Sequence, residues 1–356
     1  MEPFLVIQQG SSRYPVFVGR DLLGRVGSLI KPRGRVFVIT SEELTARFGK
    51  RVAESFEPHA DVVTMREGEP NKTIATAEAI VGELLARNAK RDSMAVVVGG
   101  GMIGDTAGFA ASIFLRGIDL VHVPTTLLAQ VDSSIGGKLA VNHAKGKNLI
   151  GSFYAPVAVV SDTSILASLP AHEFLSGLYE AMKGGVISDV ALFEAFESQR
   201  EAINAREPEV IDELIRRKIR VKAEIVSADE READMRRLLN YGHTIAHGIE
   251  AAMKYQGITH GEAVAWGMIG ANAIAVRRGL LPRDEAGRIE RTIRAYQPSA
   301  ITGLDARAIA AATEHDKKNT GSSRVMVFPR RVGECVVVSD VTEEEIAYGI
   351  DAVLSS

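Results

Sequence analysis

The chain has 356 residues, of which 46% are hydrophobic and 24% are charged, and its formal net charge is −3. This length allows two domains, and the composition is that of a globular protein rather than a disordered one. The small net charge excludes a general electrostatic affinity for nucleic acid or for an acidic membrane surface. Any specificity for anions therefore has to come from local clusters of Lys and Arg.

Three features of the sequence predict a cytoplasmic protein. The single cysteine, Cys335, permits no internal disulfide, which fits a reducing compartment. The N-terminal residues lack the basic and apolar regions of a signal peptide. The longest apolar runs, 94–104 and 263–276, are shorter than the ~18 residues that a membrane span requires.

The first half of the chain alternates short β-branched runs with helical patterns. Helices are expected at 73–88 and 103–115. Strands are expected at 4–8, 15–19, 35–40, 61–66, 95–99, 120–125 and 157–161. Strands that alternate with helices in this way predict a mostly parallel sheet covered on both faces.

From about Pro170 onward helical patterns dominate. Helices are expected at 172–198, 207–227, 235–254, 261–279, 284–296, 305–314 and 342–354. The segment 324–339 has the pattern of a β-hairpin. The change near Pro170 predicts an α/β domain at 1–171 and a helical domain at 172–356.

A glycine-rich turn, Gly99–Asp105, ends one predicted strand and opens the helix that follows it. Glycines at such a turn allow the backbone to approach a pyrophosphate, which then lies at the helix N-terminus. The spacing differs from G-x-G-x-x-G, so tight packing explains the turn equally well from the pattern alone. Glu69 and Lys72 precede an earlier helix and are either a solvated cap or a second part of a dinucleotide site.

A polar stripe is predicted in the segment 235–254. If a helix has begun by Arg236, then Arg236, Asn240, His243 and His247 lie on one face at i, i+4, i+7 and i+11. Histidines at i and i+4 can share a metal, and His260 follows soon after in the chain. Spacing alone favours a metal site of His243 with His247, completed by His260 or a carboxylate. The alternative is that all three are structural histidines.

Cationic and small polar residues are concentrated in the segment 116–148. Lys138, Lys147 and several exposed backbone N–H groups in this segment favour a binding site for a phosphate or a carboxylate. Further lysines occur at Lys183, at Lys222 and in the run 316–319. A single lysine is most often a solvated surface charge, so the interpretation depends on the whole group.

Together these motifs closely resemble the 3-dehydroquinate synthase family, a branch of the sugar phosphate cyclases. Five segments carry the resemblance: G-G-G-M-I-G-D at 99–105, P-T-T-L-L-A-Q-V-D-S-S-I-G-G-K at 124–138, G-K-N-L-I-G at 146–151, L-L-N-Y-G-H-T at 238–244 and H-G-E-A-V-A at 260–265. The resemblance implies a dehydroquinate synthase-like fold, with an α/β N-terminal Rossmann-like domain that binds NAD and an all-α C-terminal domain. One departure is Leu139-Ala140, where the family usually has Thr-Gly.

The resemblance also implies roles for individual residues. The Zn²⁺ ligands, with Co²⁺ as a possible substitute, become Glu180, His243 and His260, and His247 becomes a neighbouring substrate or proton-transfer residue. NAD-binding residues correspond to Glu69, Lys72, Gly100, Gly101, Asp105, Thr125, Thr126 and Ser168, with Lys138 and Lys147 serving both NAD and substrate. Residues for the substrate correspond to Arg116, Asp132, Lys138, Lys147, Asn148, Lys183, Lys222, Arg236, Asn240, His247 and one of Lys317 or Lys318.

The function implied by the resemblance is the conversion of 3-deoxy-D-arabino-heptulosonate 7-phosphate, a phosphorylated keto acid, into 3-dehydroquinate and phosphate. This step of the shikimate pathway proceeds through transient oxidation by NAD, phosphate elimination, reduction and intramolecular aldol closure. The family is also expected to form homodimers. Three alternatives are a related cyclase such as 2-deoxy-scyllo-inosose synthase, which acts on glucose 6-phosphate, a metal-dependent polyol dehydrogenase and a non-catalytic binding protein.

Overall fold

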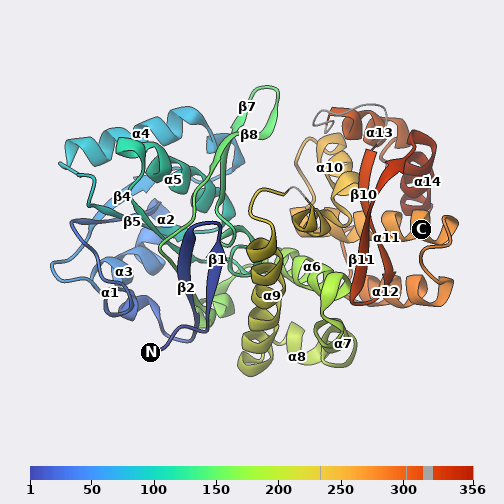
Figure 1. The fold of residues 1–356 in the computed structure, drawn as a ribbon, viewed down its shortest axis with the longest axis horizontal. Coiled ribbons are helices and arrows are strands. Elements are labelled where there is room, and N and C mark those ends of the chain that lie inside the picture. Colours follow the sequence, from blue (N-terminus) through green and yellow to red (C-terminus); the bar gives the residue numbers. More distant parts are fainter. Residues whose placement is uncertain (233, 302, 316–323, 356) are drawn as a thin grey trace. The chain divides into compact units, whose positions relative to one another are not determined.

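The computed structural model describes residues 1–232, 234–301, 303–315 and 324–355, and divides the chain into two compact units (Figure 1). The N-terminal unit comprises Met1–Leu169 together with Ile211–Ile219. The C-terminal unit comprises Pro170–Val210 and Arg220–Ser356. Among the described residues, no helix is both long enough and apolar enough to cross a membrane.

The N-terminal unit is built on a seven-stranded sheet in the order β1-β2-β9-β6-β5-β3-β4. Every neighbouring pair is parallel except β1 with β2. The strands are β1 (Leu5–Gln9), β2 (Ser12–Gly19), β3 (Val36–Ser41), β4 (Asp61–Met65), β5 (Met94–Gly99), β6 (Asp119–Pro124) and β9 (Ala158–Asp162). All seven lie where the sequence pattern predicts them, which confirms the mostly parallel sheet.

Both faces of this sheet are buried, because consecutive side chains of a strand point to opposite faces. On β3, Phe37 and Ile39 pack in one cluster with α4 (Ile74–Ala86) and α5 (Gly101–Ile113). Val36 and Val38 of the same strand pack in the other cluster, with residues of the short helices α1 (Val26–Leu29) and α3 (Lys50–Ala53). The uninterrupted apolar runs of the sequence reflect this double burial.

The strand order reverses between β3 and β5. From β3 the chain proceeds to β4 on one side, and from β5 it proceeds to β6 on the other. Thr40 Oγ1 donates to the carbonyl of Val98 at 2.7 Å and joins the carboxyl ends of β3 and β5. The glycine-rich turn follows β5 directly, so it lies at the switch point where open parallel sheets bind their ligands.

A β-hairpin formed by β7 (Lys138–His143) and β8 (Gly146–Phe153) was missed by the sequence analysis (Figure 1). The hairpin is rich in Gly, Asn and Lys, residues that are depleted in strands. Its only apolar alternation in the first strand is Leu139 and Val141, which are buried in the cluster with α4 and α5. The lysines expected to bind anions at 138 and 147 are therefore on strands rather than in a loop.

The C-terminal unit is mainly helical and also contains a β-hairpin of β10 (Arg324–Arg331) and β11 (Glu334–Val341), as the sequence pattern predicted. Its helices, with the middle of α9 assigned to the N-terminal unit, are α6 (Ala171–Ser188), α7 (Val190–Ser198), α8 (Arg200–Asn204), α9 (Pro208–Ala228), α10 (His243–Ala252), α11 (His260–Arg277), α12 (Arg283–Ala295), α13 (Ala306–His315) and α14 (Glu343–Leu354). The remaining short helix of the N-terminal unit is α2 (Glu42–Leu44).

Two of the predicted helices are wrong in extent. The single helix expected at 172–198 is two helices, because Asp189 leaves the helical conformation and its side chain accepts from Leu192 N at 3.0 Å, which caps α7. The helix expected at 235–254 begins only at His243, after a 3-10 segment, Met235–Asn240. Gly242 separates the two with a left-handed φ of 80°, so the polar stripe is not continuous.

His122 is a buried polar residue on β6. Within the described part of the chain its Nε2 has no hydrogen-bond partner. The ring borders a cavity of about 10 Å³ that is also lined by Gly104 and Ser134. Burial lowers the pKa of His122 from 6.5 to about 4, so the folded protein holds this imidazole neutral.

We expect His122 to make the protein less stable as the pH falls from 6.5 to 4. In this window the unfolded chain takes up a proton that the folded chain excludes, which reduces the free energy of unfolding by up to about 3 kcal/mol. His122→Gln removes the titrating group, so thermal unfolding of the variant should depend less on pH. Equal pH slopes for the variant and the parent protein would contradict this assignment.

Candidate active site

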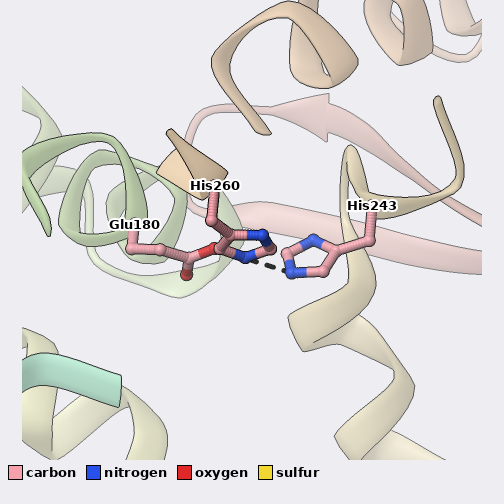
Figure 2. Close-up of side chains that lie close together, drawn as sticks. All are labelled: Glu180, His243 and His260. Carbon is pink, nitrogen blue, oxygen red and sulfur yellow. Dashed lines mark ion pairs between the residues drawn. The ribbon is translucent and has the colours of Figure 1, made fainter. Parts of the chain in front are cut away.

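Glu180, His243 and His260 converge in the C-terminal unit (Figure 2). They come from α6, α10 and α11, and one potential ligand atom from each lies within 4.8 Å of the others. His243 Nε2 lies 3.5 Å from Glu180 Oε1, and His260 Nε2 lies 3.6 Å from the same oxygen. This is the only such metal-compatible group in the part of the chain that the structure describes.

The distances of the two histidine nitrogens from Glu180 Oε1 fit a shared divalent cation. Ligands about 2.0–2.1 Å from a tetrahedral Zn²⁺ lie about 3.4 Å from one another. The two N–O separations of 3.5 and 3.6 Å are close to this value. Two imidazoles and one carboxylate leave a coordination position open for substrate, as in catalytic rather than structural zinc sites.

The second nitrogen of each histidine faces an acceptor. His260 Nδ1 lies 3.4 Å from Glu250 Oε2, and His243 Nδ1 lies 3.2 Å from the carbonyl of Tyr241. An acceptor at Nδ1 favours the tautomer whose Nε2 is free to bind a metal. Both rings are therefore oriented so that Nε2 points to Glu180.

The charges around Glu180 favour its carboxylate form. Burial opposes ionisation, but the Lys183 ammonium, 2.7 Å from Oε2, and the two imidazoles hold the pKa of Glu180 well below its ordinary value. Burial and the Lys183 charge hold the pKa of His243 well below 6.5. Burial also lowers the pKa of His260, but the Glu180 and Glu250 carboxylates outweigh it and raise that pKa to about 10.

Close helix packing brings the three ligands together. A Cβ on Gly261 would lie 1.9 Å from the carbonyl oxygen of Ser176 on α6, so only glycine fits there. Gly261 N also donates to Ser176 Oγ at 3.0 Å. Because Ser176 is one helical turn before Glu180, this contact sets His260, the neighbour of Gly261, beside the carboxylate.

His247 lies beside the three ligands but is not one of them. Its ring is edge-on to that of His243, with centroids 5.4 Å apart. The first hypothesis from spacing, His243 with His247, is therefore corrected, because Glu180 and His260 approach from other helices. The neighbouring position suits a group that carries protons or contacts a metal-bound substrate.

The other polar residues predicted in this unit differ in their burial and in their hydrogen-bond partners. Lys183 is buried and also donates to the carbonyl of Leu239 at 2.7 Å. Arg236 is buried, and its guanidinium donates to the carbonyl of Glu230. Asn240 is exposed and donates to Glu232 Oε1 at 2.6 Å, whereas Lys222 is buried on α9. Lys317 and Lys318 lie outside the described residues.

A charged network surrounds the glycine-rich turn in the N-terminal unit. Lys72 Nζ is 2.5 Å from Asp105 Oδ2 and 2.6 Å from Asn148 Oδ1. Lys147 Nζ lies 3.7 Å from Glu69 Oε1. Residues from three separate segments, 69–72, 105 and 147–148, are thus brought together.

The remaining predicted residues of the N-terminal unit are placed differently from one another. Gly100 and Gly101 start α5, and Thr125 N donates to the carbonyl of Gly99 at 3.0 Å. Thr126 Oγ1 accepts from Ala129 N, Asp132 lies in the π-helical turn Ala129–Ser133, and Lys138 is exposed. Ser168 contacts Arg47 rather than this network. Arg116 precedes β6 and so lies at the edge of the sheet opposite the glycine-rich turn.

The sequence analysis missed two residues, Glu250 and Asn142, that contact predicted site residues. Glu250 follows His243 by two helical turns on α10, a spacing that could have suggested a shared face. Asn142 donates to Glu69 Oε1 at 2.8 Å and accepts from Asn148 N at 2.9 Å. No spacing rule indicates that Asn142 contacts Glu69 and Asn148, because these contacts depend on the pairing of β7 with β8.

Comparisons with known proteins agree with this architecture. Residues 62–176 match the family described as 3-dehydroquinate synthase N-terminal, and residues 177–319 match 3-dehydroquinate synthase C-terminal. The 3-dehydroquinate synthase of Solibacter usitatus is 41% identical over 96% of each chain, and that of Halorhodospira halophila is 40% identical over 96% of each.

Solved structures of related cyclases have the same fold. A 2-deoxy-scyllo-inosose synthase complexed with carbaglucose-6-phosphate, NAD⁺ and Co²⁺ has a TM-score of 0.87 and 31% identity, covering 97% of this chain and 98% of the other. A 2-epi-5-epi-valiolone synthase from Streptomyces hygroscopicus subsp. jinggangensis, with NAD⁺ and Zn²⁺ bound, has a TM-score of 0.86 and 27% identity, covering 96% of each chain.

The Rossmann-like sheet, the His₂Glu group and the similarity to solved cyclases over almost the whole chain define a sugar phosphate cyclase. Within that class, the two family models and the relatives at 37–41% identity decide the family. The chain belongs to the 3-dehydroquinate synthase family.

We expect Glu250→Gln to weaken metal binding without removing a ligand. The amide cannot supply the negative charge that Glu250 places beside His260 Nδ1, so affinity for Zn²⁺ should fall by about 10- to 100-fold. Competition with a fluorescent chelator measures the change. Unchanged Zn²⁺ affinity in Glu250→Gln would show that Glu250 does not orient His260.

Proposed function

We propose that the protein is a 3-dehydroquinate synthase, which converts 3-deoxy-D-arabino-heptulosonate 7-phosphate into 3-dehydroquinate and phosphate. The observation that carries the proposal is the convergence of Glu180, His243 and His260 in a chain of this family. Relatives named 3-dehydroquinate synthase, matched over almost the whole chain, support the same substrate.

The two units are proposed to divide the work. The N-terminal unit, 1–171, would bind NAD around its glycine-rich turn, and the C-terminal unit, 172–356, would hold the metal and much of the substrate. NAD would supply a reversible hydride acceptor, and a divalent ion held by Glu180, His243 and His260 would supply a Lewis acid for an alcohol oxygen. Structures of related cyclases with NAD⁺ and with Co²⁺ or Zn²⁺ bound support the use of both cofactors.

For NAD we propose the residues that surround the turn. Lys72, held by Asp105 and Asn148, gives the turn a positive charge that suits a pyrophosphate. Backbone N–H groups at Gly100 and Gly101 open α5 and add the positive end of a helix dipole. Glu69, Thr125 and Thr126 complete the proposed set.

For the substrate we propose cations that neutralise its phosphate and carboxylate and two groups that handle protons. Asp132 and His247 are proposed for the protons, because one is a carboxylate beside the glycine-rich turn and the other lies next to the ligand His243. The proposed cations and their polar neighbours are Lys138, Lys147, Asn148, Lys183, Lys222, Arg236 and Asn240.

The compartment proposed for this activity is the cytoplasm. The protein is proposed to act as a homodimer and to bind no nucleic acid. A single cysteine suits a reducing compartment, and the net charge of −3 gives no general attraction for nucleic acid. Homodimerisation is proposed from family membership, and sedimentation velocity would test it.

A second candidate function is that of 2-deoxy-scyllo-inosose synthase, because a structure of that enzyme shares the fold at a TM-score of 0.87. Its ligand there, carbaglucose-6-phosphate, is a phosphorylated carbocycle. The two functions differ in substrate, since only the heptulosonate carries a carboxylate. The two 3-dehydroquinate synthase family models favour the heptulosonate.

We expect NAD-dependent release of phosphate from the heptulosonate phosphate and little release from glucose 6-phosphate. Chelation of the metal should lower the rate at least about 100-fold, because the alcohol oxygen loses its Lewis acid. NADH absorbance should not accumulate, since the hydride returns to the substrate. Stoichiometric NADH would instead indicate a polyol dehydrogenase, and faster release from glucose 6-phosphate would support the second candidate.

We expect His260→Ala to abolish metal binding and turnover together, because it removes one of three protein ligands. Metal content after dialysis and phosphate release from the heptulosonate phosphate measure the two effects. His172→Ala is the matched control, since His172 is an exposed histidine on α6. Full activity of His260→Ala without bound metal would exclude this ligand assignment.

A further inference from the structure

Lys218 occupies a position where the sequence pattern of α9 calls for an apolar residue. The buried residues Ile211, Leu214, Ile215 and Ile219 form one stripe along this helix. Position 218 lies in that stripe at i+7 from Ile211, and its side chain is 0% exposed. A lysine here has a large desolvation penalty that leucine or methionine would avoid.

The chain returns to the N-terminal unit to place this lysine. Leu169 is the last residue of the first pass, yet Ile211–Ile219 belongs to the same compact unit. Arg216 helps to fix the segment, because it donates to the carbonyl of Val18 at 2.7 Å and its guanidinium lies over the ring of Phe4. These contacts hold the stretch of α9 that carries Lys218 against the N-terminal unit.

Lys218 Nζ lies 3.9 Å from Asp132 Oδ1. This separation is too long for a direct hydrogen bond, so the ammonium acts on the carboxylate through its charge. Charge acts strongly here, because Lys218 is fully buried whereas the Asp132 side chain is 28% exposed. One end of the pair is thus fixed in the core and the other is open to a ligand.

Asp132 lies next to the glycine-rich turn. It belongs to the π-helical turn Ala129–Ser133. The next residue, Ser133, packs against Gly101 of the glycine-rich turn, since a Cβ added to Gly101 would lie 3.1 Å from Ser133 Oγ. The backbone of Asp132 is held as well, since its carbonyl accepts from Ile135 N at 3.0 Å. The orientation of its carboxylate is left to the side chains around it, among which Lys218 supplies a buried positive charge.

We infer that Lys218 is a positioning residue that keeps Asp132 as an oriented carboxylate for the substrate. This inference rests on the proposed function, in which Asp132 handles protons of the heptulosonate. Lys218 itself does not touch the substrate in this account, because it is fully buried beneath Asp132. A buried lysine in an apolar stripe lowers the stability of the fold. Such a residue is expected where the activity of the protein requires its charge.

The decisive variant is Lys218→Met, which keeps the length of the side chain and continues the apolar stripe. We expect it to leave thermal stability unchanged or higher, because it removes a buried charge, and to lower kcat/KM for the heptulosonate phosphate by about 10- to 100-fold. Lys218→Arg keeps the charge and should stay within about threefold of wild type. Arg217→Met, which removes a partly exposed cation paired with Glu213 on the same helix, is the matched control and should leave kcat/KM unchanged.

A double-mutant cycle with Asp132→Asn tests whether Lys218 acts through Asp132. If it does, Lys218→Met adds little to the loss of kcat/KM caused by Asp132→Asn, and the double variant has the same kcat/KM as Asp132→Asn alone. Independent, multiplying losses would overturn the inference, as would a Lys218→Met enzyme with wild-type kcat/KM or one that loses stability and activity together. A wild-type protein that releases no phosphate from the heptulosonate would instead overturn the proposed function.

Discussion

The buried carboxylate of Glu180 is the group on which the C-terminal unit depends. An ionised carboxylate that is almost inaccessible to water is stable only if positive charge surrounds it. Lys183 supplies one such charge from the next turn of α6, and the imidazoles of His243 and His260 face its other side. One carboxylate and two imidazoles that face the same point are donor groups that suit a divalent cation.

Helix packing, rather than loop structure, creates this group. α11 meets α6 at Gly261 and meets α10 near Gly267, where a Cβ would lie 2.0 Å from the carbonyl oxygen of Gly242. These contacts let three helices approach closely enough for their ligands to share one point in space. Rigid helices hold ligands more accurately than mobile loops do, which suits catalysis by a metal ion.

The same principle recurs in the N-terminal unit, where buried lysines are paired with carboxylates beside the glycine-rich turn. Lys72 pairs with Asp105, and Lys218 pairs with Asp132. In each pair the lysine is less exposed than the carboxylate. The ammonium groups are thereby held below the surface, while the carboxylates that a ligand would contact remain more accessible.

The strands, most helices and the family can be read from the amino-acid sequence, because apolar periodicity and five motifs are local properties of the chain. Spacing in the sequence indicated His243 and His260, and the family resemblance added Glu180. The start of α10 at His243 and the pairing of β7 with β8 became evident only in the folded chain, since a left-handed glycine and a polar hairpin leave little periodic signal. Contacts of Glu250 with His260 and of Lys218 with Asp132 were likewise fixed by packing, because each joins residues whose proximity depends on how helices and strands meet.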